Sequence, residues 1–400
     1  MRDTSSQRLL YLTIGIFLVY LTVGAPLPVI PRFVHETLGY SPLVVGLVIG
    51  AQAAATLLAR TFAGALSDRR GPKFCALAGA VICIVVGLIY AAAVALSGNR
   101  SLSLTVLVLG RLVLGVGDSL FITGAMSWSV HITGPQRAGK GLVWVGAALY
   151  GATALGAPLG VQAAQDHGFA TVAIAVAVLA ALGGLLVARL PAPPVIAGTR
   201  MPLAHVIGRI WKPGLGLAMS GIGFAVIAAF VTLFYEERGW QNAAYALTAF
   251  GVAFIVARIF FGSLPDRLGG ARVALASLAV EIAGQGLLWT AASPIMAMAG
   301  AALTGFGYSL TFPALGVEAV RRVPQQSRGA ALGAYVVCLD LALALGPPVA
   351  SLLVQPFGYA ATYLLGAGCA ALAALIATSL LREDEAGGAA PRAYSERAES

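Results

Sequence analysis

The sequence is poor in charged residues, cysteine and histidine, and these shortages exclude several classes of protein. Charged residues make up only 10% of the 400 positions, against about 25% in soluble globular domains. The four cysteines, Cys75, Cys83, Cys338 and Cys369, are scattered through apolar runs, without the spacing of a metal site or a disulfide framework. The composition therefore favours neither a soluble domain nor a small fold held together by disulfides or zinc.

A nucleotide-binding loop is also lacking, although one stretch approaches its pattern. Residues 134–141 read Gly-Pro-Gln-Arg-Ala-Gly-Lys-Gly and fit Gly-x4-Gly-Lys, but Gly141 stands where a Ser or Thr would hold magnesium, and no strand precedes the loop. We expect a loop that leads into a helix. The sequence then predicts neither an enzyme nor a cofactor or metal site.

Long apolar runs are the dominant feature of the sequence. Hydrophobic residues make up 59% of the chain, and its length allows roughly twelve helices of ~20 residues with short loops. The sequence predicts an all-α integral membrane protein. The predicted spans are 9–31, 42–65, 74–96, 103–129, 139–163, 169–189, 214–235, 243–264, 271–291, 294–317, 328–354 and 359–381.

The net charge of +9 is interpreted as a topology signal and not as a nucleic-acid surface, because no basic patch with interleaved aromatic residues accompanies it. With the amino terminus inside, nearly all Lys and Arg in the loops fall on the cytoplasmic side. Only Arg32, Arg100 and Arg238 fall outside. This is the bias of the positive-inside rule, and it predicts that both termini are cytoplasmic.

The longest loop divides the predicted spans into two sets of six. We expect an N-terminal six-helix half at 1–190, a cytoplasmic linker loop at 191–213, a C-terminal six-helix half at 214–381 and a cytoplasmic tail at 382–400. Within the linker, residues 200–212 could form a short amphipathic helix on the membrane or a plain connection.

A polar segment occurs twice, between the second and third spans of each half. Residues 59–71 and 257–269 match in their Ala, Arg, Phe, Gly, Leu, Asp, Arg and Gly, which indicates an internal duplication. An Asp in such a loop can accept hydrogen bonds from the free N–H groups at a helix start, so we interpret the segment as a gate; a basic loop that only fixes topology is the alternative. The gating candidates are Gly64, Asp68, Arg69, Gly71, Lys73, Gly262, Asp266, Arg267 and Glu318.

The spacing Gly-x-x-x-Asp-Arg-x-Gly in this segment resembles the loop signature of the major facilitator superfamily (MFS). Residues 110–117 and 156–160 resemble the fourth-helix and fifth-helix motifs of that family, and residues 305–309 and 346–348 echo them in the second half. The amino-acid sequence of these motifs is similar to that of the YhhS/YfcJ group of bacterial MFS proteins. The resemblance implies the MFS fold, with two pseudo-symmetric six-helix halves that carry a solute by alternating access.

One departure from the family pattern concerns the acid at the cytoplasmic end of the fourth helix. Residues 128–131 read Trp-Ser-Val-His there, so the charge relay of the first half lacks its carboxylate. In the second half, Glu318 could do that work for Arg267 or Arg272.

Charged residues inside the spans are the functional candidates, because each costs at least ~2.5 kcal/mol at mid-helix unless it has a partner or an aqueous cavity. Asp118 is the first candidate for proton coupling and Asp340 the second; for both, a packing role is the alternative. Glu281 is expected to have a structural partner. Arg60 and Arg258 could brace the duplicated loops or reach the headgroups.

The expected cavity residues follow from helix identity in the resemblance. They are Tyr20, Arg111, Trp144, Tyr150 and Tyr308, for which packing or an interfacial position is the alternative. The predicted function is proton-driven export of a small organic solute (drug or metabolite efflux) by a monomer in the inner membrane. A proton-coupled importer or a sugar exporter is the alternative, and a receptor or scaffold the remote one.

The first prediction concerns topology. A reporter domain fused after Ser97 or Gln165 should be extracellular, and one fused after Pro72 or Thr199 should be cytoplasmic, because the Lys and Arg bias orients each loop pair. Paired phosphatase and fluorescent-protein fusions measure this. A swapped result at any of the four sites would overturn the span count.

Overall fold

The computed structural model describes residues 4–134, 138–193, 203–323 and 328–396. Within these ranges the chain is almost entirely helical and contains no strand. Twelve of its helices are long and apolar enough to cross a membrane. The predicted all-α architecture and the predicted number of spans are confirmed.

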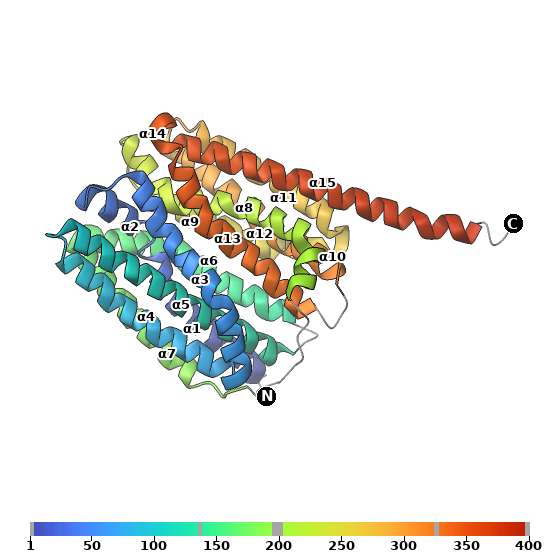
Figure 1. The fold of residues 1–400 in the computed structure, drawn as a ribbon, viewed down its shortest axis with the longest axis horizontal. Coiled ribbons are helices and arrows are strands. Elements are labelled where there is room, and N and C mark those ends of the chain that lie inside the picture. The colour runs from blue at the N-terminus through green and yellow to red at the C-terminus, as the bar shows by residue number, and fades with distance from the viewer. Residues whose placement is uncertain (1–3, 135–137, 194–202, 324–327, 397–400) are drawn as a thin grey trace.

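The helices of the first half occupy the lower left of Figure 1. The six long ones are α1 (Thr4–Gly24), α3 (Pro42–Arg70), α4 (Pro72–Ala95), α5 (Arg100–Thr133), α6 (Ala138–His167) and α7 (Phe169–Ala188). The first span is interrupted after Gly24, and α2 (Val29–Arg32) and a π-helical turn, η1 (Phe33–Thr37), complete it.

The second half lies at the upper right of Figure 1. Its long helices are α8 (Leu203–Glu237), α9 (Ala244–Phe261), α11 (Gly270–Trp289), α12 (Pro294–Arg321), α13 (Arg328–Ser351) and α15 (Ala360–Glu396), with the short α10 (Leu264–Leu268) and α14 (Val354–Phe357) between them. Helix α8 begins inside the stretch predicted as linker, and α15 continues into the stretch predicted as tail. No separate amphipathic helix precedes α8 within the described residues, because the chain from Leu203 onward is one helix.

Helix boundaries follow ordinary local signals. Proline occupies the first helical position of α3, α4 and α12, where its missing N–H costs nothing. The side chain of Asn99 caps α5, and that of Ser293 caps α12. In the duplicated loops, Gly71 and Gly269 have φ angles of 92° and 91°, a conformation that side chains disfavour. The duplication therefore repeats the turn as well as the sequence.

The break after α1 is matched by the glycines of α6. A Cβ atom placed at Gly160 would lie 2.0 Å from the carbonyl oxygen of Ala25, and one placed at Gly24 would lie 2.5 Å from that of Ala152. The small residues of the fifth-helix motif thus let α6 contact the backbone where α1 ends, as small residues do between membrane helices.

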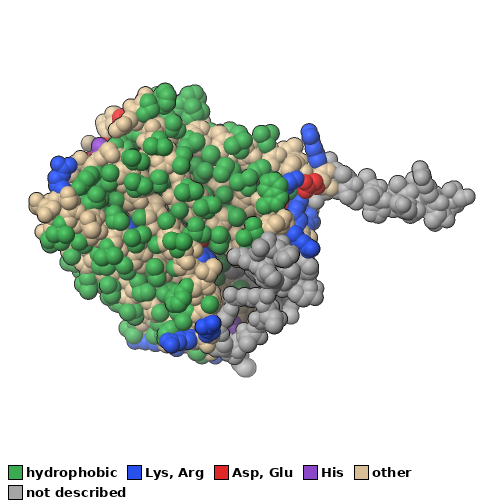
Figure 2. Space-filling view, viewed as in Figure 1, with side chains coloured by type: hydrophobic (Ala, Val, Ile, Leu, Met, Phe, Trp, Pro, Cys, Tyr) green, Lys and Arg blue, Asp and Glu red, His purple; other side chains and the backbone are tan. Residues whose placement is uncertain are grey.

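The bundle has two ends, which we call the terminal face and the opposite face. Helix α1 begins and α15 extends outward at the terminal face, whereas α2 and α14 lie at the opposite face (Figure 1). Hydrophobic side chains cover most of the surface between the two faces, and Lys and Arg gather toward the ends (Figure 2). This arrangement suits a bundle whose middle lies in lipid.

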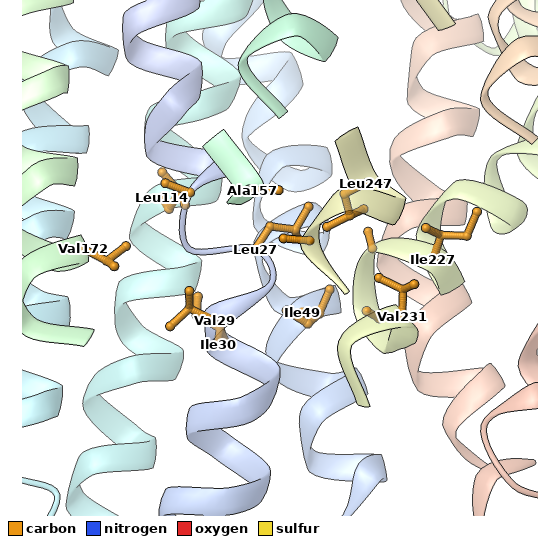
Figure 3. Close-up of a cluster of buried hydrophobic side chains, with 14 of the residues drawn as sticks. Leu27, Val29, Ile30, Ile49, Leu114, Ala157, Val172, Ile227, Val231 and Leu247 are labelled. Atoms are coloured by element: carbon orange, nitrogen blue, oxygen red, sulfur yellow. The ribbon is translucent and has the colours of Figure 1, made fainter. Parts of the chain in front are cut away.

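Contact between the halves is concentrated toward the opposite face. The largest buried apolar cluster contains residues of both halves, and Figure 3 shows Leu27 and Ile49 of the first half near Leu247 of the second. An ion pair between Arg32 of α2 and Glu236 of α8 also joins the halves there. A second cluster, from Ile210 to Leu380, contains residues of the second half only. The described halves are therefore sealed at the opposite face, and the second half has a core of its own toward the terminal face.

Duplicated glycines bring the helices of each half together. A Cβ atom at Gly115 of α5 would lie 2.2 Å from the carbonyl oxygen of Gln52 on α3, and one at Gly305 of α12 would lie 2.2 Å from that of Phe250 on α9. Both neighbours are backbone atoms, which cannot move aside as a flexible side chain can. Each half therefore depends on one glycine at the same place.

The second prediction tests these contacts. Gly115→Ala and Gly305→Ala should each lower the free energy of unfolding by about 1–3 kcal/mol, because the added methyl group forces two helix backbones apart. Thermal and denaturant unfolding of the purified protein in detergent measures the change. Gly286→Ala is the control, because no atom lies within 4 Å of a Cβ there and Ala favours a helix over Gly. Equal effects at all three positions would contradict the packing argument.

Candidate functional site

A buried ion pair joins the two halves. The guanidinium of Arg60, on α3, donates to Oδ2 of Asp340, on α13, from Nε at 2.8 Å and from Nη2 at 2.6 Å. The two side chains are only 16% and 8% exposed. The interpretation of Arg60 as a side chain that reaches the headgroups is therefore wrong, because its charge is neutralised by a carboxylate of the other half.

Asp118 lies beside this pair. Its Oδ1 accepts a hydrogen bond of 2.5 Å from the hydroxyl of Tyr20, on α1, and the buried side chain of Gln52, on α3, also lies near it. The charge of Arg60 acts on both Asp118 and Asp340. We call Tyr20, Gln52, Arg60, Asp118 and Asp340 the polar cluster. It draws on α1, α3 and α5 of the first half and on α13 of the second, so it brings together three residues that the sequence singled out for coupling or the cavity.

Five aromatic rings form a second group between the halves. Tyr150 of α6 stacks on Phe254 of α9 with ring centroids 3.7 Å apart, and its hydroxyl donates to that of Tyr308, on α12, at 3.5 Å. Phe224 of α8 stacks on Phe250 at 5.0 Å. We call these residues the aromatic cluster. Tyr150 and Phe224 are partly exposed, and the other three rings are buried.

Arg258 lies at the edge of the aromatic cluster. Its Nη2 donates to the carbonyl oxygen of Ser309 at 2.9 Å, and its guanidinium lies 5.1 Å from the ring centroid of Phe254. Cation–π contact of this kind stabilises a charge in an apolar setting. The described hydrogen bonds of Arg258 go to α12, and its role as a brace for the duplicated loop stays a prediction.

The duplication relates the two groups. The overlay that pairs Arg60 with Arg258 relates α3 to α9, and the matching Gly-Pro motifs relate α13 to α6 and pair Asp340 with Tyr150. One interface between the halves therefore contains an arginine and a carboxylate, and the other contains an arginine and a phenol. The asymmetry places the acidic groups of the site on one side.

Two predicted cavity residues lie outside both clusters. Arg111 is 2% exposed, and its guanidinium donates to the carbonyl oxygens of Val48 and Ile49 at 3.2 Å each. It joins α5 to α3 inside the first half. Trp144 is 42% exposed near the start of α6.

Glu281 is fully buried between α8 and α11. Its Oε2 accepts a hydrogen bond of 2.6 Å from Ser220, so the expected structural partner is a hydroxyl.

The gating candidates are spread over the terminal face. Gly64 is partly buried in α3, Gly71 ends that helix, Gly262 ends α9, and Arg69 and Arg267 are exposed. The side chains of Asp68 and Asp266 lie outside the described residues. Lys73 donates to the carbonyl oxygens of Ala188 and Leu190 at 2.7 and 2.6 Å, so its cation satisfies the end of α7.

Glu318, on α12, is buried beside the start of α11. Its Oε1 accepts from the backbone N–H of Ala271 at 3.1 Å, and its carboxylate pairs with Arg322 at 3.0 Å and Arg321 at 3.6 Å. The predicted partners were Arg267 and Arg272, whereas the partners found are the helix start and two arginines of its own helix. In the first half, the spacing that aligns Gly115 with Gly305 puts Trp128 at this position, and it is buried.

The sequence argument did not single out Gln52 or the three phenylalanines of the aromatic cluster. A signal was present: Gln52, Thr56 and Arg60 recur every four residues along α3, as do Phe250, Phe254 and Arg258 along α9. Residues four apart share a helix face, so each arginine marks the face of its helix that looks toward the other half.

Comparison with known proteins adds a family match. The family model described as Major Facilitator Superfamily matches residues 12–247 and 214–399. An uncharacterized MFS-type transporter of Salmonella typhimurium is 40% identical over 382 residues, which cover 96% of this chain and 98% of that protein. An uncharacterized MFS-type transporter of Burkholderia pseudomallei is 45% identical over 364 residues, 91% of this chain and 89% of that protein.

Solved structures share the fold at low sequence identity. The crystal structure of a D-xylose-proton symporter superposes with a TM-score of 0.76 at 16% identity, covering 92% of this chain and 96% of that one. The finer grouping with YhhS/YfcJ stays a prediction.

The third prediction concerns the ion pair between the halves. Asp340→Asn or Arg60→Gln alone should lower the free energy of unfolding by about 3–5 kcal/mol, because each leaves one buried charge without its partner. The double variant should lose clearly less than the sum of the two. Denaturant unfolding of all four proteins closes the cycle. Lys212→Gln is the control: its pair with Glu383 is 30% and 47% exposed, where an ion pair contributes about 0–1 kcal/mol. Additive single effects would contradict the pairing.

Proposed function

The chain belongs to the Major Facilitator Superfamily and is a multi-pass membrane transporter; from this premise we propose that it couples proton movement to the transport of a small organic solute by alternating access. The observation that supports the proposal is the polar cluster, in which Arg60 and Asp340 form an ion pair between the halves and Asp118 lies beside that pair. Ionisable groups inside a membrane are costly and are kept at ion pathways.

Asp118 is the better proton carrier of the two. The hydrogen bond to its side chain comes from the neutral hydroxyl of Tyr20, whereas Asp340 is bound to a cation. A low-dielectric setting disfavours the charged form of a carboxylate, and a nearby cation favours it. Asp118 can therefore gain and lose a proton while Asp340 stays ionised.

Proton occupancy of Asp118 would change the contact between the halves. When Asp118 is neutral, Arg60 is attracted to Asp340 alone, and the ion pair between α3 and α13 is strengthened. When Asp118 is charged, it competes for the same guanidinium and weakens that pair. The proton thus biases two arrangements of the halves, which is what coupling requires.

The duplicated loops at the terminal face are proposed to act as the gate. Glu318 fixes the start of α11 and two arginines of α12, and Lys73 fixes the end of α7. Asp68 and Asp266 are proposed to hold the halves together when this face closes. The arrangement described is sealed at the opposite face, so in this arrangement we propose that solute reaches the site from the terminal face.

Direction follows from how the proton and the solute share the site. Exchange of an inward-moving proton for a solute gives export, which we propose as the physiological direction; movement of both together gives import, the alternative. We place the protein in the bacterial inner membrane as a monomer, with the terminal face in the cytoplasm.

The fourth prediction tests proton coupling. Asp118→Asn is nearly isosteric but cannot titrate, so it should abolish solute accumulation driven by a pH jump while leaving exchange between equal solute pools intact. Proteoliposomes measure both, with a solute first identified by thermal shift. Glu281→Gln, an equally isosteric change outside the polar cluster, is the control and should keep both activities. Accumulation by Asp118→Asn under an imposed proton gradient would move the coupling role to Asp340 or to another ion.

A further inference from the structure

Arg258 is a cation inside the protein whose described partners include no acid. Among the residues that the structure describes, no carboxylate lies within 4 Å of its guanidinium. Its hydrogen bonds go to Ser309, at 2.9 Å to the carbonyl oxygen and 3.5 Å to the hydroxyl. The rings of Phe254 and Phe312 lie 5.1 and 6.0 Å from it. All of these partners are neutral.

The duplication shows what is missing. Arg60, the counterpart of Arg258, has Asp340 as its partner, and the position that corresponds to Asp340 in the second interface is Tyr150. A charge at membrane depth costs at least ~2.5 kcal/mol unless a partner or an aqueous cavity compensates it. The chain carries the cation at both positions and the acid at only one.

The other charges of the site do not serve Arg258. Arg60, Asp118 and Asp340 form a set of their own, which is neutral when Asp118 carries its proton. Arg111 is 2% exposed and donates to two backbone carbonyl groups of α3. Arg258 therefore contributes one uncompensated positive charge to the space between the halves.

Open space lies beside this guanidinium. On α6, across the interface, a Cβ atom placed at Gly146 would have a single described neighbour within 4 Å, Nη1 of Arg258 at 4.0 Å. A ligand group can therefore approach Nη1 from the side of α6. A guanidinium presents a planar fork of N–H donors that binds a carboxylate through two parallel hydrogen bonds.

The aromatic cluster continues from the guanidinium toward the opposite face. Phe254 lies under Arg258, Tyr150 stacks on Phe254, and Phe224 lies 5.9 Å from Tyr150. Tyr150 and Phe224 are partly exposed. Ring faces of this kind contact flat apolar groups by offset or edge-to-face stacking.

We propose that the transported solute is an organic anion with a flat apolar body, whose carboxylate binds Arg258 and whose body lies against Tyr150 and Phe224. The inference rests on the proposed function, since it names the substrate class of the same site. A monoanion bound to Arg258 offsets the positive charge that this side chain contributes. An inside-negative membrane potential drives such an anion outward, by about 2.3 kcal/mol per charge for each 100 mV, which agrees with export.

The test uses three probes of one shape that differ in charge: 2-naphthoate, 2-naphthamide and 2-naphthylmethylammonium. Binding to the purified full-length protein is measured as the rise in unfolding temperature with probe concentration. 2-Naphthoate should raise the unfolding temperature of the wild type in a saturable way, and the amide and the ammonium should not. Arg258→Gln should weaken the response to 2-naphthoate at least tenfold, and Arg258→Lys, which keeps the charge but not the fork, should fall between.

Arg238→Gln is the matched control, because it removes an arginine at the opposite face, where Phe234 and Trp240 lie beside it. It should respond to 2-naphthoate as the wild type does. Circular dichroism and the unfolding temperature without probe establish that each variant is folded. The proposal is overturned if the amide or the ammonium stabilises the wild type as well as 2-naphthoate does, if Arg258→Gln keeps its response, or if 2-naphthoate, benzoate and cinnamate all give none.

Transport in proteoliposomes separates this inference from the proposed function. Proton-driven accumulation of a neutral or cationic solute would overturn the anion proposal and leave proton coupling standing. Carriage of 2-naphthoate that ignores the pH gradient would support the role of Arg258 and contradict the proton coupling assigned to Asp118.

Discussion

The structure depends on the cost of an unpaired charge where water is excluded. Each charge placed among the spans must be compensated inside the protein, by an acid, by backbone carbonyl groups or by a ring face. Arg60 uses the first means and Arg111 the second, whereas Arg258 combines one backbone carbonyl group with ring faces. Of the three arginines, Arg258 has the least charge compensation within the described residues. It lies where we propose that the solute binds. A binding site needs such a group, because polar groups that are already paired in the empty protein gain little free energy from a ligand.

The internal duplication allows the charges of the two halves to be compared position by position. Gly115 and Gly305 bring the helices together at matching places, and Gly71 and Gly269 repeat the same turn. In the overlay of the two halves, the acid at Asp340 corresponds to the phenol of Tyr150. The acid at Glu318 corresponds to the indole of Trp128. The two halves keep the same backbone contacts while their charges have diverged. The proposed functional residues therefore include positions where the two repeats differ.

Much of the fold could be predicted from the sequence, because spans, loop motifs and the duplication are local patterns. The twelve spans follow from hydrophobicity. The partner of Arg60 could not be predicted in this way, because Asp340 lies on a helix of the other half and no local spacing joins them. The partners of Glu318 illustrate the same limit. Helix α8 begins before the predicted span 214–235, and α15 ends after the predicted span 359–381, because a helix can continue past its apolar stretch.

The seal at the opposite face is made largely of aliphatic and aromatic side chains shared by both halves, among them Leu27, Ile49 and Leu247. Opening that face would transfer these side chains from protein contacts to water. Exposure of apolar surface raises the heat capacity, so the enthalpy of the transition must change with temperature. The free-energy difference between the two arrangements is then a curve in temperature, and the preference of the empty protein for one arrangement is weaker in the cold, where the hydrophobic contribution declines.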